Sequence, residues 1–219
     1  MSRLANPRFM FVYPFIFATF FLANTTEASY RAGALLVALG ELIRLWANGY
    51  VGHVKIRHLI TAGPYGYARN PLYVGSLLIG LGVCVVVGRV WFAALALGVL
   101  LFVYRRQMIM EEEILRREWG ASFDRYCREV PRWGFTWRSY SRPNGRWSME
   151  GIAASKEWKT LIWVTVILIA LYFREELWQE RESFFSEDFV KHSVLLGLAV
   201  VLLMIDGVFE IRKRLHRHA

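Results

Sequence analysis

The residues best suited to chemistry in this sequence lie in the stretch HLITAGPYGYARNPLYVG, residues 58–75. Gly63–Pro64 predicts a turn, because glycine takes positive φ readily and proline fixes its own φ. Asn70 and Pro71 are residue types favoured at the N-cap and at the first position of a helix. A helix start attracts anions through its unpaired N–H groups, and Arg69 beside it carries donors suited to a carboxylate. The stretch therefore predicts a place for an anionic group.

Three tyrosines surround the same turn, namely Tyr65, Tyr67 and Tyr73. Aromatic faces attract cations that come within about 6 Å of the ring centre. Together with Arg69 and the helix start, they suit a ligand that has a carboxylate, a flat ring and a positive centre. The alternative is an ordinary interfacial loop, with tyrosines at the level of the lipid headgroups and Arg69 on a lipid phosphate. The residues alone leave both interpretations open.

A second cluster of chemistry-bearing residues is RRQMIMEEEILRREWGASFDRYCREVPRW, residues 105–133. It reads as a membrane helix that continues beyond the bilayer. The consecutive glutamates Glu111–Glu113 repel one another, so at least one of them should have a cationic partner. A solvated face balanced by Arg116 and Arg117 accounts for at least one of the three.

The elements that must position these residues are helices in a membrane. The chain has 219 residues, of which 55% are hydrophobic, and a formal net charge of +9. No apolar block reaches the ~20 residues that cross a ~30 Å hydrocarbon core, but each becomes long enough with interfacial Trp, Tyr, Lys and Arg at its ends. We predict an all-α polytopic membrane protein with about six transmembrane helices rather than six buried helices of a soluble protein. The blocks are 9–23, 32–47, 72–87, 90–104, 161–173 and 194–205.

The charges predict the orientation of these helices. If six segments alternate from a cytoplasmic N-terminus, the inside segments carry 21 of the Lys and Arg residues and the outside segments carry 4. This split satisfies the positive-inside rule and places both termini, and both chemistry-bearing stretches, at the cytoplasmic face. The net charge of +9 is then a sign of topology and of attraction to anionic membrane lipid, and no nucleic-acid partner is expected.

Three blocks, in this order, resemble the isoprenylcysteine carboxyl methyltransferase family, within a wider group that includes phospholipid N-methyltransferases. They are RLWANGYVG (44–52), HLITAGPYGYARNPLYVG (58–75) and EExxLxxxWGxxFxxYxxxVPR, from Glu111 to Arg132. The resemblance implies an integral-membrane enzyme that uses S-adenosylmethionine without a Rossmann domain. The sequence agrees, because it has no strand followed by a G-x-G-x-x-G turn.

The resemblance also implies roles for individual residues. Glu111 would hold the methionyl ammonium of the cofactor, with Glu112 as the alternative. The cofactor site would consist of His58, Leu59, Ile60, Gly63, Tyr65, Asn70, Pro71, Leu72, Tyr73 and Glu111. The catalytic candidates are Arg69, Glu112 and Arg106.

Two departures from the family pattern bear on these roles. Asn70 replaces the family's histidine, so a proton-transfer role at that position is lost. Gln107 stands where the family commonly has an arginine that faces the substrate carboxylate, and Arg106 lies next to it. One residue turns a helical side chain by about 100°. The resemblance therefore leaves open whether Arg106 reaches the same place.

The expected reaction is methyl transfer to a lipid or prenylated small-molecule acceptor. An isoprenylcysteine-type carboxylate is favoured, and it needs no base. A phospholipid or other amine is the alternative, for which Glu112 is the candidate base. Two rivals from other classes are a membrane sterol-type reductase that uses NADPH and a non-catalytic relative that only binds lipid.

The resemblance and the apolar blocks together divide the chain. We expect an N-terminal transmembrane helix in residues 1–30, for which a cleaved signal peptide is the alternative. Residues 31–135 would form a methyltransferase-like membrane core, with its cofactor site on the cytoplasmic face. Residues 136–157 read as a linker. Residues 158–219 would form a C-terminal helix pair with an acidic outer loop and a basic tail, which could dock a protein partner.

Two charged residues, Glu41 and Arg44, fall inside the second apolar block. Their spacing of three puts them on one helix face, where they could pair with each other. Charges at membrane depth are costly and usually face a bundle interior or a wet cavity. A structural ion pair between helices and a cavity wall are therefore both open.

Overall fold

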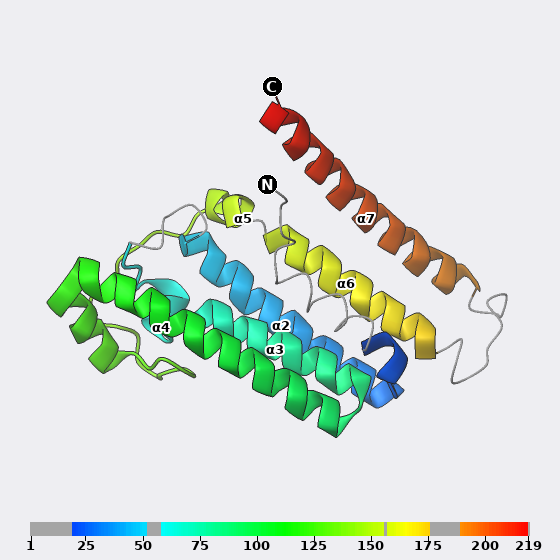
Figure 1. The fold of residues 1–219 in the computed structure, drawn as a ribbon, viewed down its shortest axis with the longest axis horizontal. Helices are drawn as coiled ribbons and strands as arrows, with labels where there is room; N and C mark the ends of the chain where they lie inside the picture. The colour runs from blue at the N-terminus through cyan, green and yellow to red at the C-terminus, as the bar shows by residue number, and fades with distance from the viewer. Residues whose placement is uncertain (1–18, 52–57, 156, 176–188, 219) are drawn as a thin grey trace, which may run out of the picture. The chain divides into compact units, whose positions relative to one another are not determined.

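The structure is a computed structural model, which describes residues 19–51, 58–155, 157–175 and 189–218. Within these ranges the regular structure is entirely helical (Figure 1), which confirms the all-α class. The helices are α2 (Glu27–Val51), the 3₁₀ turn η1 (Gly63–Gly66), α3 (Pro71–Val87), α4 (Val90–Glu129), α5 (Met149–Ser155), α6 (Glu157–Arg174) and α7 (Phe189–His218).

The chain divides into two compact units. The first comprises Met1–Ala34, Val83–Val90 and Lys159–Ala219, and the second comprises Leu35–Gly82 and Trp91–Trp158. The second unit holds both chemistry-bearing stretches. It also holds residues 136–157, which the sequence suggested as a linker.

Three of the described helices are long and apolar enough to cross a membrane, namely Glu27–Val51, Val90–Glu129 and Val190–Val208. Of the six predicted spans, those at 32–47, 90–104 and 194–205 lie in these helices. α3 has only 17 residues, or about 26 Å at 1.5 Å per residue, which is less than a full hydrocarbon core. α6 carries charges near both of its ends. Most of the 9–23 block lies outside the described residues, so the count of six and the orientation stay predictions.

The turn and the helix start in the 58–75 stretch form where the sequence predicts them. Gly63 has a φ of +58°, and a Cβ there would lie 2.2 Å from the ring of Tyr50. α3 begins at Pro71, and the carbonyl of Asn70 accepts the first helical hydrogen bonds from the N–H groups of Tyr73 (3.1 Å) and Val74 (3.2 Å). The local sequence therefore fixes the shape of this stretch.

α4 breaks at Gly120, which has φ 45° and ψ −121°. An L-residue rarely adopts such backbone angles, whereas glycine adopts them easily. The last part of α4 turns back beside the preceding part (Figure 1). Accordingly, Arg116 reaches Asp124 across the break at 3.1 Å, and Arg132 reaches Glu112, twenty residues earlier. The helix that the sequence predicted therefore folds back on itself at Gly120, and residues after the break lie beside residues before it.

Candidate functional site

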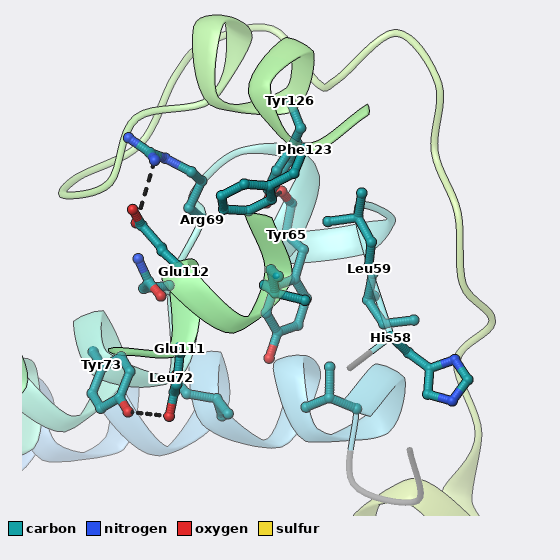
Figure 2. Close-up of a pocket in the computed structure, with 14 residues that line it drawn as sticks. His58, Leu59, Tyr65, Arg69, Leu72, Tyr73, Glu111, Glu112, Phe123 and Tyr126 are labelled. Carbon is teal, nitrogen blue, oxygen red and sulfur yellow. Dashed lines mark hydrogen bonds and ion pairs between the residues drawn. The ribbon is translucent and has the colours of Figure 1, made fainter. Parts of the chain in front are cut away.

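The second unit contains a pocket where the two chemistry-bearing stretches meet (Figure 2). The pocket is lined by side chains from the end of α2, from the loop between residues 58 and 70, from the first turn of α3, and from α4 on both sides of its break at Gly120. The lining residues are Val51, His58, Leu59, Ile60, Tyr65, Arg69, Asn70, Leu72, Tyr73, Glu111, Glu112, Leu115, Phe123 and Tyr126.

Ten of the thirteen residues proposed from the sequence line this pocket. The exceptions are Gly63, Pro71 and Arg106. Gly63 shapes the η1 turn and Pro71 starts α3, so both act through the backbone. Arg106 is exposed on α4 and does not line the pocket. The side chain of its neighbour Gln107, by contrast, donates a hydrogen bond to the pocket residue Glu111.

Glu111 presents an oriented carboxylate to the pocket. Its Oε1 accepts hydrogen bonds from the Tyr73 hydroxyl (2.8 Å) and from Nε2 of Gln107 (3.0 Å). The ring of Tyr73 packs against Tyr104, with 5.1 Å between ring centroids. Among the described residues, Oε2 of Glu111 has no hydrogen-bond partner. The carboxylate is therefore held by one oxygen, and the other is available to a cationic ligand group.

Glu112, the next residue, lies in a different environment. It is 3% exposed, and its two oxygens accept hydrogen bonds from Arg132 at 3.0 and 2.7 Å. Nη1 of Arg69 lies 3.3 Å from its Oε1 (Figure 2). The hydrogen bond to Glu112 raises the pKa of Arg132 above its usual value. Both oxygens of Glu112 are thus engaged by guanidinium groups, which leaves this carboxylate badly placed to accept a proton from a substrate.

The cluster of Arg69, Glu112 and Arg132 carries one excess positive charge, because it joins two guanidinium groups to one carboxylate. Nε of Arg69 is buried and has no hydrogen-bond partner among the described residues. Buried donors are normally satisfied, and an unpaired one lining a pocket favours an anionic ligand group. The pocket therefore offers an open carboxylate oxygen at Glu111 and a positive cluster at Arg69.

Backbone contacts join the loop to the segment that follows α4. The N–H of Arg69 donates to the carbonyl of Pro131 at 3.0 Å, and Nδ2 of Asn70 donates to the carbonyl of Arg132 at 3.3 Å. The predicted helix N-cap position of Asn70 is thus filled, but its side chain is used to hold the returning chain. These contacts position Arg132 over Glu112.

Aromatic side chains from the part of α4 after Gly120 form another wall of the pocket. Phe123 and Tyr126 are 1% and 2% exposed, and the Tyr126 hydroxyl donates to the Tyr65 carbonyl at 2.6 Å. Burial raises the pKa of Tyr65 above its usual value, so its phenol stays neutral at physiological pH. The sequence-based site did not include Val51, Leu115, Phe123 or Tyr126. All four lie in the motif blocks that carry the family resemblance, so the sequence did mark them. Only the break at Gly120, however, brings Phe123 and Tyr126 to the pocket.

The charged residues of α2 lie outside this pocket. Arg44 pairs with Glu157 and also donates to Ser76, whereas the pair that Glu41 and Arg44 could make on one helix face does not form. Nδ2 of Asn48 donates to the other Glu157 oxygen at 2.7 Å. The alternative of an ion pair between helices therefore holds for Arg44, with α6 supplying the partner. The sequence alone could not show that α6 begins beside α2.

Comparison with known proteins gives a family match to part of the chain. The family model described as phospholipid methyltransferase matches residues 28–122. A nickel-cobalt-cadmium resistance protein of Alcaligenes xylosoxydans is 30% identical over 106 residues, 48% of this chain and 49% of that protein. The protein-S-isoprenylcysteine O-methyltransferase of Schizosaccharomyces pombe is 30% identical over 122 residues, 51% of this chain and 52% of that protein.

A third relative is a cobalt-zinc-cadmium resistance protein of Cupriavidus metallidurans, 46% identical over 52 residues, which are 23% of this chain and 24% of that protein. The chain thus spans about half the length, or less, of the curated relatives it matches. No solved structure is significantly similar to it.

Proposed function

From the match of residues 28–122 to the phospholipid methyltransferase family model, we propose that the pocket binds S-adenosylmethionine for methyl transfer to a lipid-like acceptor. An isoprenylcysteine-type carboxylate is the favoured acceptor. The positive-inside distribution of Lys and Arg supports a reaction at the cytoplasmic face of the membrane.

The observation that carries this proposal is the pair of opposite charges in one aromatic pocket. The methionyl part of the cofactor is a zwitterion. Its ammonium suits the open Oε2 of Glu111, and its carboxylate suits the positive cluster at Arg69 and Arg132. The faces of Tyr65 and Tyr73 suit the flat adenine ring or the sulfonium cation.

The cofactor supplies a methyl group on a positively charged sulfur, and the residues of the chain bind and orient the reactants. Tyr73 and Gln107 fix the Glu111 carboxylate before the ligand arrives, which lowers the entropy cost of binding. Phe123 and Tyr126 form a buried wall that keeps water away from the reacting groups. Transfer to a carboxylate then needs orientation and a dry site, but no base.

The engagement of Glu112 supports the carboxylate acceptor. An amine acceptor must lose a proton before or during transfer, and Glu112 was the candidate base. Both of its oxygens already accept hydrogen bonds from arginines. A carboxylate acceptor does not require this function of Glu112.

A second candidate is methyl transfer to the amine of a phospholipid. The match to a family model described as phospholipid methyltransferase favours it. The two acceptors are separated by incubating purified protein with methyl-labelled donor and either a prenylated cysteine or a phospholipid with a primary amine. Label in an alkali-labile ester indicates the carboxylate, and label in an alkali-stable N-methyl product indicates the amine.

The cofactor assignment is tested by calorimetric titration of S-adenosylhomocysteine into the purified full chain. Glu111→Gln should weaken binding about tenfold or more, because it removes the charge that faces the ammonium. Glu113→Gln is the matched control, since Glu113 is exposed and paired with Arg117 outside the pocket. Equal binding by the wild type and Glu111→Gln would refute the placement of the ammonium, and no binding by the wild type would refute the cofactor.

A further inference from the structure

Most of the segment that the sequence predicts as a linker contacts the loop that lines the pocket, residues 58–70. We call residues 136–148 of this segment the strap. Main-chain groups of the strap and of the loop hydrogen-bond to one another at both ends of the 59–67 stretch. The pairs are Thr61 N to Asn144 O (2.9 Å), Ala62 N to Asn144 O (3.1 Å), Tyr140 N to Gly66 O (2.9 Å) and Thr136 N to Tyr67 O (2.9 Å).

Asn144 is the centre of this contact. In addition to the two bonds to its carbonyl, its N–H donates to Oγ1 of Thr61 at 2.9 Å, and its Nδ2 donates to the carbonyl of Leu59 at 2.9 Å. The Thr61 hydroxyl in turn donates to the carbonyl of Arg142 at 3.1 Å. Thr61 is 2% exposed, so its N–H and hydroxyl groups have little access to water and depend on the strap for their partners.

Close packing accompanies the hydrogen bonds. A Cβ at Gly66 would lie 2.6 Å from Oγ of Ser139, and a Cβ at Gly145 would lie 3.0 Å from the side chain of Ile60. A side chain at Gly49, near the end of α2, would collide with the indole of Trp147. The strap therefore fits against the loop without spare space.

The strap also supports the aromatic wall. Tyr140 is 8% exposed and packs edge-on against Tyr126, with 5.2 Å between ring centroids. It belongs to one buried cluster with Leu59, Phe123, Tyr126 and Val130. Three members of this cluster, Leu59, Phe123 and Tyr126, line the pocket, so the strap contacts the pocket walls from behind.

We propose that the strap is a positioning element of the donor site, with Asn144 as the residue that sets the conformation of Leu59, Ile60 and Thr61. The strap lies beyond the segment that matches the family model. This inference rests on the proposed function, because the pocket that the strap shapes is the one assigned to S-adenosylmethionine. The side chain of Asn144 acts through the loop and does not line the pocket itself.

The test uses the full chain and three variants. Asn144→Asp replaces the Nδ2 donor by an oxygen that faces the Leu59 carbonyl, and Thr61→Val removes the hydroxyl shared with Asn144 at nearly constant volume. Arg146→Ala is the control, because its exposed side chain takes no part in these contacts. The measurements are S-adenosylhomocysteine affinity, methyl-donor KM and kcat, and hydrogen exchange at the amides of Thr61 and Ala62.

We expect about tenfold weaker binding and a correspondingly higher donor KM for Asn144→Asp, the loss that one hydrogen bond represents. The kcat at saturating donor should stay within about twofold, since the strap does not touch the reacting atoms. Thr61→Val should also weaken binding. The double variant should lose less binding free energy than the sum of the losses in the two single variants. A variant that merely unfolded in part would lower kcat as well.

Two further results of these measurements distinguish a failure of the strap proposal from a failure of the proposed function. If the wild type binds S-adenosylhomocysteine and Asn144→Asp binds it equally well, the strap proposal is overturned and the function stands. If the wild type does not bind it, the proposed function fails. In that case the exchange measurement still decides whether the strap holds the loop. Faster exchange at Thr61 and Ala62 in Asn144→Asp supports the strap, and unchanged exchange overturns it.

Discussion

Removal of the Glu112 charge should destabilise the protein far more than removal of either neighbouring glutamate charge. Glu112 is 3% exposed and is the only carboxylate, among the described residues, that contacts Arg69 and Arg132. Glu112→Gln keeps the shape of the side chain but leaves two guanidinium groups without a counter-charge. The side chain of Arg69 is 13% exposed, so water can replace the lost partner there only in part.

The magnitude follows from these exposures. Breaking a buried ion pair by removing one partner costs about 3–5 kcal/mol. The side chain of Arg132 is 35% exposed, so solvent screens its part of the loss. We therefore expect about 3 kcal/mol, at the lower end of that range, or a fall in the unfolding midpoint of about 6–12 °C for a chain of this size.

The assay is thermal unfolding of purified protein in one detergent, with all three glutamates changed in turn. Glu113→Gln should change stability by about 0.5 kcal/mol or less, because its partner Arg117 is exposed. Glu111→Gln should leave the midpoint nearly unchanged while it weakens ligand binding. The double variant Glu112→Gln/Arg132→Gln should recover part of the loss, since the excess charge is smaller. A Glu112→Gln protein as stable as the wild type would refute the ion cluster.

Three further predictions concern single residues. Gly120→Ala should lower stability by about 1–3 kcal/mol because of its φ of 45°, whereas Gly98→Ala, in the interior of α4 with open space around it, should gain about 0.5–1 kcal/mol in the same unfolding assay. Tyr73→Phe removes a hydrogen bond to Glu111, and calorimetry should show about tenfold weaker S-adenosylhomocysteine binding. Burial raises the pKa of Tyr65 above 10.0. The folded state then binds this proton more tightly than the unfolded state, so its stabilising effect is complete below pH 10 and declines above it. Unfolding curves measured from pH 8 to pH 11 should fall less steeply for Tyr65→Phe.

Local patterns in the sequence were sufficient for the helical class, the family resemblance and the start of α3. The turn at Gly63–Pro64 and the helix that begins at Pro71 depend only on neighbouring residues, so propensity and capping determine them. The three ordered motif blocks indicated the membrane methyltransferase family, and the match of residues 28–122 to the phospholipid methyltransferase family model supports that resemblance. The roles proposed for individual site residues remain predictions.

Features that depend on contacts between distant segments were not accessible to the same reasoning. Glu111 and Glu112 are one residue apart, and which of them faces the arginines depends on where the chain returns after Gly120. The pairing of Arg44 with Glu157 requires α6 to start beside α2. The Gly, Pro and polar residues of the strap have the composition of a linker, and only its hydrogen bonds and packing against the pocket loop distinguish it from one.

The break in α4 explains why the pocket needs residues beyond the family segment. The match to the family model ends at residue 122, two residues after Gly120. Glu111 lies before that point, whereas Phe123, Tyr126 and Arg132 follow it. A chain that ended at the break would keep the open carboxylate but would lose the aromatic wall and one of the two arginines that neutralise Glu112. The matched segment therefore supplies the charge that would hold a methyl donor, and the returning chain supplies the walls that would keep that charge in a dry, oriented site.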